Sequence, residues 1–229
     1  MSVVALIPAH NEVERVGATV TAVRATGLVD RLLLIDDGSD DGTADAARDA
    51  GAEVLRLVRN RGKGGALQAG LDAAAADADV LVLLDADLGR SAGQLDVLVE
   101  PIIGGMADMT VAVLPRPAGS GGFGLVKALA RRGVALLTGL RTEAPLSGQR
   151  ALTRRAWTAA VPFARGYGVE VALTVRVCRA GLTVIEVPTT MSHAATGRSA
   201  AGFAHRGRQF GAVLVTLFRL AFERHSGGA

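Results

Sequence analysis

Two apolar runs that each end in aspartates constrain the fold of this chain more than any other feature. Residues 32–37 read LLLIDD, and residues 80–87 read VLVLLDAD. Runs that are apolar throughout, rather than alternating, are typical of strands buried on both faces of a parallel sheet. Ligands of open α/β sheets bind beyond the carboxyl ends of the strands. The sequence therefore predicts a group of carboxylates at the edge where a ligand would bind.

The first part of the chain alternates between apolar runs and helical stretches. We expect strands over 3–7, 31–35, 53–58, 80–84 and 109–114, and helices over 12–25, 43–50, 63–76 and 94–103. Strand–helix–strand units with short links form right-handed crossovers and a parallel sheet. The fold class predicted is α/β, with a Rossmann-like, mostly parallel sheet flanked by helices.

The pattern changes after Pro115. Residues 116–124 read RPAGSGGFG, which is incompatible with regular structure, and we interpret this loop as a lid rather than a linker. Beyond it we expect helices over 125–138, 154–160, 169–179 and 210–222, and a strand over 183–187. Because neither a repeat nor a second core is evident, we expect one domain over residues 1–229 with two functional halves, 1–114 and 115–229.

Composition narrows the classes of function. The chain is 49% hydrophobic and 21% charged, which argues against disorder. A net charge of +3 with only 3% aromatic residues gives no basis for a nucleic-acid partner. The single cysteine, Cys178, excludes an internal disulfide. No apolar run reaches the roughly 20 residues that span a bilayer. We expect a cytoplasmic protein whose 210–222 tail packs on the domain or touches a membrane surface.

The aspartates themselves suggest a chemistry. Asp85 and Asp87 lie two residues apart just past an expected strand, where they can share one Mg²⁺ or Mn²⁺ ion and a diphosphate bound to it. Asp37 can accept hydrogen bonds from a base N–H or from ribose hydroxyls. A negatively charged helix start would explain Asp40 and Asp41, but not the doubled Asp at the tip of the strand.

Two further positions have alternative interpretations. Glu12 either caps the helix that follows it or binds a ribose hydroxyl. Lys63 lies in a glycine-rich segment, NRGKGG, whose amides can meet a phosphate at a helix N-terminus. The spacing of that segment is not that of a Walker A loop, which argues against an ATPase.

In their order and spacing, four segments resemble the family 2 nucleotide-sugar glycosyltransferases and their relatives with the GT-A fold. The segments are PAHNE (8–12), IDDGSDDGT (35–43), NRGKGGALQAG (60–70) and LLDADL (83–88). The resemblance implies a nucleoside-diphosphate-sugar donor, with UDP as the first choice of nucleotide, and a divalent metal, Mg²⁺ or Mn²⁺. The donor-side positions that it implies are Pro8, Ala9 and Glu12 for the nucleoside, Asp37 for the base, Lys63 and Ala86 for the nucleotide, Asp85 for the ribose or metal, and Asp87 for the metal.

The second half resembles the acceptor half of polyprenyl-phosphate sugar transferases and glucosyl-3-phosphoglycerate synthases. The segments that carry this likeness are PLSGQRA (145–151) and FARGYGVEV (163–171). The resemblance assigns nucleotide-sugar binding to residues 1–114 and binding of a phosphorylated acceptor to residues 115–229. The acceptor-side residues that it implies are Ser147, Gly148, Gln149 and Tyr167. Arg198 either binds a phosphate of the donor or acceptor or is only a surface charge.

Two more roles come from the same resemblance. His193 follows the last expected strand, where it would be a third metal ligand beside Asp85 and Asp87. Glu170 would lie nearest the sugar hydroxyls or the acceptor, and would be the general base if the enzyme inverts stereochemistry. Its alternative role is that of an acidic residue favoured at a helix start.

Two other functions stay open alongside the transferase. A nucleotidyltransferase that makes nucleotide sugars usually carries a basic glycine-rich loop after its first strand, where this chain has PAHNE. A non-catalytic nucleotide-sugar-binding relative is disfavoured because Asp85 and Asp87 are both present. The oligomeric state is open too, with a homodimer among the alternatives.

Overall fold

A computed structural model describes residues 1–115, 124–193 and 200–223, and side chains throughout these ranges except over 200–208. The loop that we interpreted as a lid lies outside the described residues apart from Gly124, which begins a helix. Arg198 also lies outside them.

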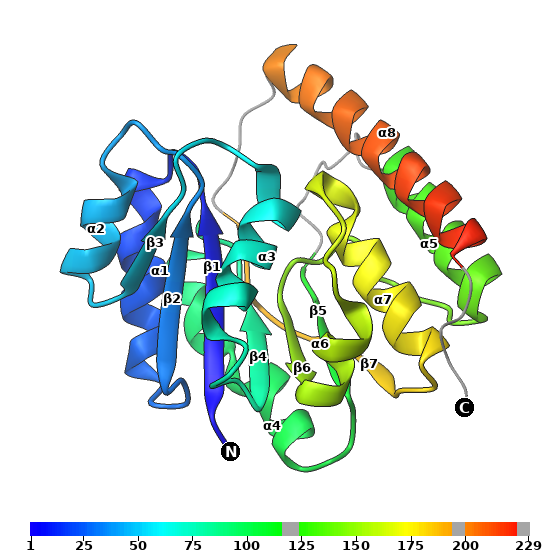
Figure 1. Cartoon of the computed structure of the whole chain (residues 1–229), viewed down its shortest axis with the longest axis horizontal. Helices are drawn as coiled ribbons and strands as arrows, with labels where there is room; N and C mark the ends of the chain where they lie inside the picture. The colour runs from blue at the N-terminus through cyan, green and yellow to red at the C-terminus, as the bar shows by residue number, and fades with distance from the viewer. Residues whose placement is uncertain (116–123, 194–199, 224–229) are drawn as a thin grey trace.

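Seven strands form one sheet in the part of the chain that the structure describes (Figure 1). They are β1 (Val3–Ala9), β2 (Arg31–Asp36), β3 (Glu53–Arg56), β4 (Val80–Leu83), β5 (Met109–Val113), β6 (Arg150–Thr153) and β7 (Val184–Pro188). The spatial order is β3-β2-β1-β4-β6-β5-β7, and β6 alone runs antiparallel to its neighbours. The prediction of a mostly parallel sheet is confirmed.

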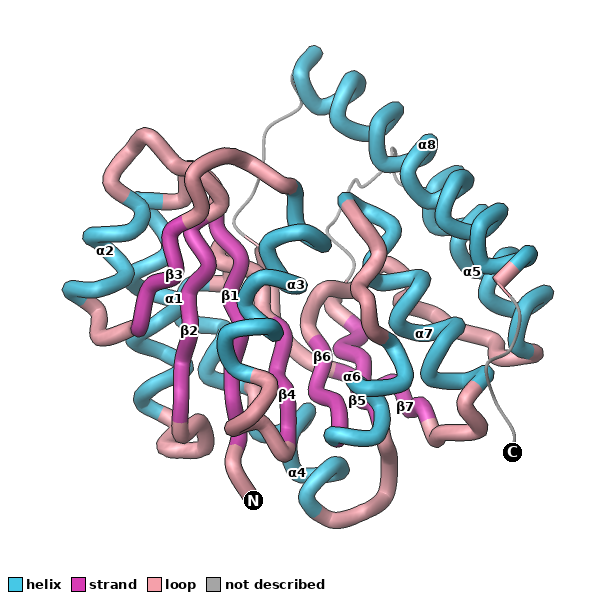
Figure 2. Tube along the Cα trace, viewed as in Figure 1, coloured by secondary structure: helices cyan, strands magenta, loops and turns pink. Residues whose placement is uncertain are grey.

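Helices cover both faces of this sheet (Figure 2). They are α1 (Val13–Ala25), α2 (Thr43–Asp49), α3 (Gly62–Ala74), α4 (Asp96–Ile103), α5 (Gly124–Thr138), α6 (Arg154–Ala160), α7 (Val169–Arg179) and α8 (Ala200–Phe222), with 3₁₀ turns η1 (Gly89–Gln94) and η2 (Gly166–Gly168). One face carries α1, α2 and α4, and the other carries α3, α6 and α7. Helices α5 and α8 add an outer layer on α7.

The continuous apolar runs follow from this layering. In β1, Val3, Ala5 and Ile7 point into the core cluster under α1, whereas Val4 and Leu6 point into the cluster under α3. Both sets are buried, so alternation between polar and apolar residues would place polar groups in a core.

Three elements differ from those expected. Strand β6 was not expected, because it is only four residues long and begins with a charged residue, Arg150. Pairing with β4 and β5 on its two sides holds it in place. The helix expected over 94–103 begins at Asp96, after the 3₁₀ turn η1, and the tail helix begins at Ala200 rather than at 210.

Candidate active site

The carboxyl ends of three neighbouring strands frame the site. Strand β1 lies between β2 and β4 and is parallel to both, so the two aspartate groups reach the same edge of the sheet on either side of β1. Ala9, at the end of β1, pairs in register with Asp36. Pro8 is half-buried and Ala9 is buried at this edge.

The first aspartate pair stabilises the loops around the site. Asp36 is fully buried, accepts a hydrogen bond from the Ser39 amide at 2.9 Å, and lies 3.2 Å from the Arg56 guanidinium. Asp37 accepts a 2.7 Å hydrogen bond from the Arg61 amide just before α3. Asp36 therefore acts on the protein's own turn, and Asp37 ties the end of β2 to the start of α3.

Gly38 shows how closely these two loops approach. A Cβ at this position would lie 2.9 Å from the amide nitrogen of Asn60, and its φ of +74° favours glycine. The contact brings the LLLIDDG segment against the NRGKGG segment, which the sequence separates by a helix and a strand.

Glu12 lies near the same edge but contacts its own helix. Its carboxylate pairs with Arg15 at 3.0 Å, and its backbone N–H donates to the Thr43 hydroxyl at 2.8 Å. Glu12 occupies the N-cap position of α1, where its backbone carbonyl accepts the first bonds of the helix, from the amides of Arg15 and Val16. Its side chain makes no capping hydrogen bond.

Lys63 joins the two halves of the chain. Its Nζ lies 2.5 Å from Asp85 Oδ1, beyond β4, and 2.8 Å from Glu170 Oε1, on α7. Burial lowers the pKa of Lys63, but the negative charges of Asp85 and Glu170 outweigh burial and raise that pKa above its usual value. The ammonium is therefore charged at neutral pH.

A glycine lets α3 bring Lys63 to this position. A Cβ at Gly64 would lie 1.9 Å from the Ala164 carbonyl oxygen, so any side chain here would separate α3 from the 164–166 segment. That segment leads through η2 to Glu170. Gly64 thus serves packing between the two halves of the chain.

The Ser147–Gln149 turn lies directly against Lys63 and Asp85. Gln149 Nε2 donates to Asp85 Oδ2 at 2.7 Å, and the Ser147 hydroxyl donates to Gln149 Oε1 at 3.1 Å, which orients the amide. A Cβ at Gly148 would lie 2.3 Å from Lys63 Nζ. Burial raises the pKa of Asp85, but Lys63 and His193 outweigh burial and hold it below its usual range.

Asp85, Asp87 and His193 form the one group of three side chains able to ligate a metal ion that is found among the described residues, with potential ligand atoms within 4.8 Å of one another. His193 Nδ1 lies 2.9 Å from Asp87 Oδ1, and its Nε2 lies 3.9 Å from Asp85 Oδ2. The hydrogen bond that His193 donates to the Asp87 carboxylate, with the charge of Asp85, raises the pKa of His193 despite burial. Two carboxylates and one imidazole are a donor set that suits Mn²⁺ and is compatible with Mg²⁺.

Of the other residues predicted for the site, Tyr167 and Ala86 have described positions and Arg198 does not. Tyr167 is half-buried in η2, three residues before Glu170. Ala86 is buried between the two metal-ligating aspartates.

Arg150 was not predicted from the sequence as a residue that supports the site. It is fully buried, and its guanidinium donates to the carbonyls of Ser147 at 2.8 Å and Pro145 at 3.3 Å, and to the Thr174 hydroxyl at 2.9 Å. Burial lowers its pKa to about 10. Arg150 holds the turn that carries Gln149. An arginine directly before apolar residues was the one signal that pointed to it.

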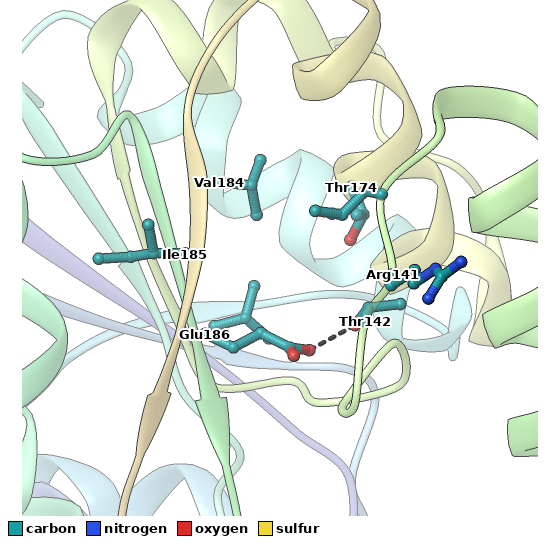
Figure 3. Close-up of a pocket in the computed structure, with 8 residues that line it drawn as sticks. Arg141, Thr142, Thr174, Val184, Ile185 and Glu186 are labelled. Atoms are coloured by element: carbon teal, nitrogen blue, oxygen red, sulfur yellow. Dashed lines mark hydrogen bonds between the residues drawn. The ribbon is translucent and has the colours of Figure 1, made fainter.

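Glu186, on β7, supports the segment before the turn. Its carboxylate accepts hydrogen bonds from the amides of Glu143 and Ala144, both at 2.7 Å, and from the Thr142 hydroxyl. Figure 3 shows Glu186 and Thr142 in the wall of a pocket of about 290 Å³ that Thr174 also lines. Neither Lys63 nor the metal-ligating residues line this pocket.

Residues 4–158 match the family model described as Glycosyl transferase family 2. The chain is 31% identical to the undecaprenyl-phosphate mannosyltransferase of Micrococcus luteus over 216 residues, and this alignment covers 87% of each protein. Over 195 residues it is 35% identical to the glucosyl-3-phosphoglycerate synthase of Mycolicibacterium paratuberculosis, covering 74% of this chain and 58% of that protein.

Solved structures are similar over nearly the whole chain. The glucosyl-3-phosphoglycerate synthase of Mycobacterium tuberculosis in complex with phosphoglyceric acid aligns with a TM-score of 0.81 and 29% identity, over 99% of this chain and 82% of that one. The same enzyme in complex with Mn²⁺, UDP and phosphoglyceric acid aligns with a TM-score of 0.79 and 29% identity, over 99% and 80%. These likenesses confirm the predicted GT-A type of α/β fold and favour glycosyl transfer over nucleotidyl transfer.

Proposed function

Because the chain belongs to glycosyl transferase family 2, we propose that it moves a hexose from a nucleoside-diphosphate sugar, a UDP-sugar first of all, to a phosphorylated acceptor. The observation that carries this proposal is the double ion pair of Lys63 with Asp85 and Glu170. It joins the donor-side strand ends to the acceptor-side helix at one point. The relatives that were crystallised with UDP, Mn²⁺ and phosphoglyceric acid support the same assignment.

On the donor side, Asp85, Asp87 and His193 would hold Mg²⁺ or Mn²⁺. Their ligand atoms already lie close together, and the set offers hard oxygen donors with one imidazole. A bound divalent ion neutralises charge on the diphosphate as the sugar–phosphate bond breaks. Gln149, bonded to Asp85 Oδ2, and Lys63, bonded to Asp85 Oδ1, orient that carboxylate.

Around the nucleotide, Pro8, Ala9 and Glu12 would line the nucleoside pocket at the end of β1. Asp37 would read the base from the end of β2. Lys63 would add positive charge beside the leaving diphosphate, in a largely buried setting where such charge is more effective than in water.

On the acceptor side, Glu170 would be the carboxylate nearest the transferred sugar. It is buried, and Lys63 holds one of its oxygens. The Ser147–Gln149 turn and Tyr167 would border the acceptor. Glu170 serves as general base if stereochemistry is inverted, whereas a retaining reaction needs none.

Donor binding is the first test. UDP, GDP, UDP-glucose and GDP-mannose, each with and without Mn²⁺, are screened by thermal unfolding. A ligand present at 100 times its Kd stabilises the folded state by about 2.7 kcal/mol, which raises Tm by about 5–10 °C for a chain of this size. We expect a metal-dependent shift for uridine nucleotides that Asp87→Ala abolishes and the exposed control Asp49→Ala retains. If none of the four nucleotides raises Tm, the proposal is overturned.

A further inference from the structure

Helices α5 and α8 form the outer layer of the molecule on the acceptor side, packed side by side on α7 (Figure 1). Their contact is close: a Cβ at Gly133 of α5 would lie 2.4 Å from the Leu217 side chain of α8. The inner side of α8 buries Val213, Leu217 and Leu220. Its opposite side is therefore held in a set orientation.

That opposite side of α8 is apolar. We term four exposed residues, spaced four positions apart along the helix, the α8 stripe: Phe210, Leu214, Phe218 and Phe222. Val215, also exposed, follows Leu214 directly in the helix. Phe218 is 66% exposed and Phe222 is 72% exposed, and their ring centroids lie 4.8 Å apart. Exposed apolar surface of this extent, gathered on one helix, marks an interaction surface. The neighbouring α5 adds exposed Leu125 and Leu136.

The charges on these two helices all have one sign. Their sequences contain Lys127, Arg131, Arg132, Arg206, Arg208 and Arg219, and neither contains Asp or Glu. Glu223, which follows α8, already pairs with Arg176 on α7 at 2.6 Å. An exposed apolar helix face, on a helix whose charged residues are all basic, is the pattern of helices that lie on anionic membranes.

The same charges disfavour a second copy of the chain as the occupant. In a symmetric dimer the same surface of both copies meets, so basic side chains would approach basic side chains. Neither helix offers a carboxylate to pair with them. An anionic lipid surface supplies the complementary charge.

The α8 stripe lies on the reverse side of the helix that supports the active site. Thr216, on the inner side of α8, packs so closely under η2 that a Cβ at Gly168 would lie 1.9 Å from its hydroxyl oxygen. Two residues later comes Glu170, which contacts Lys63. A surface that binds the α8 stripe would therefore lie near the acceptor side of the site.

We propose that the α8 stripe docks peripherally onto an anionic lipid bilayer, whose negative charge complements the net positive charge of α5 and α8. Presentation of the phosphorylated acceptor at that lipid surface is a consequence that rests on the proposed function. Among the residues that the structure describes, no helix is both long and apolar enough to cross a membrane.

Flotation of the full chain with vesicles tests the docking. Vesicles of phosphatidylcholine with and without phosphatidylglycerol are compared at low and high salt, and we expect binding to the anionic vesicles that weakens with salt. The double variant Phe218→Glu/Phe222→Glu should bind about 100-fold more weakly or worse, because two phenylalanines can no longer be buried. The matched control Ile103→Glu/Met106→Glu alters two exposed apolar residues near the end of α4 and should bind like the unchanged chain.

Three results would overturn the docking proposal. The unchanged chain does not float with anionic vesicles, or the Phe218→Glu/Phe222→Glu variant floats equally well. The third result is that neither protein floats, and sedimentation shows a dimer of the unchanged chain that Phe218→Glu/Phe222→Glu converts to a monomer. The α8 stripe would then contact a second copy of the chain. The UDP-dependent thermal shift with Mn²⁺ is measured on the same variant and should be unchanged. Failure of that shift in every protein would count against the proposed function and not against docking.

Discussion

Replacing Lys63 by methionine is the sharpest test of the double ion pair. The substitution keeps the length of the side chain and removes the ammonium that lies 2.5 Å from Asp85 and 2.8 Å from Glu170. Lys63 and Asp85 are each 20% exposed and Glu170 is 7% exposed, so the carboxylates left behind are largely desolvated. Removing one partner of a buried ion pair costs about 3–5 kcal/mol, and the partial exposure here favours the lower end.

A loss of about 3 kcal/mol lowers Tm by about 6–12 °C for a chain of this size. The pKa of Lys63 is raised in the folded chain. Its stabilising effect is therefore complete below the usual lysine pKa and is lost only as pH rises through the folded pKa, at strongly alkaline pH. The difference in Tm between the unchanged chain and Lys63→Met should accordingly be equally large at pH 7.5 and at pH 9.

The assay is thermal unfolding without metal at both pH values. Lys127→Met is the matched control, because Lys127 is the other lysine of the chain and lies part-exposed on α5. Lys63→Met should also weaken binding of UDP with Mn²⁺, whereas Lys127→Met should not. Equal Tm values for Lys63→Met and Lys127→Met at pH 7.5 would refute the reasoning.

Three further changes probe the same site. Gly148→Ala places a Cβ 2.3 Å from Lys63 Nζ, so kcat/KM should fall by about 100-fold, while Gly124→Ala, with open space around it, should leave it unchanged. Arg150→Met removes the hydrogen-bond donors to the turn that carries Gln149. In steady-state kinetics the KM for the acceptor should therefore rise more in Arg150→Met than in Arg155→Met, which alters an exposed arginine. Equal KM values in the two variants would contradict this role of Arg150. Because the pKa of His193 is raised and a proton competes with the metal, calorimetric Mn²⁺ affinity should be weaker at pH 5.5 than at pH 7.5, and a pH-independent affinity would argue against His193 as a ligand.

The buried strands could be predicted because their cause is local. Both faces of β1 are covered by helices, so every residue from Val3 to Ile7 must be apolar, and that pattern is readable without the structure. The same holds for the positions of Asp37 and Asp85 after their strands. Strand β6 could not be predicted in this way, because its four residues are held by neighbours that lie far away in the chain.

The contacts that support the Ser147–Gln149 turn could not be predicted from the sequence either. Glu186 accepts hydrogen bonds from Glu143 and Ala144 across a separation of more than 40 residues. Arg150 finds acceptors in Pro145 and Ser147 only because the turn folds back over it. Neither interaction leaves a spacing or a periodicity that reveals its partner.

By itself the sequence determined the α/β fold, the family, and which acidic residues stand at the ends of strands, since each depends on local residue pattern. Only the tertiary structure decided that Lys63 contacts Asp85 and Glu170 together. That contact depends on how closely α3 approaches the 164–166 segment, where Gly64 leaves no space for a side chain. Packing between distant segments sets this distance, and distance determines whether carboxylates repel one another or share a cation.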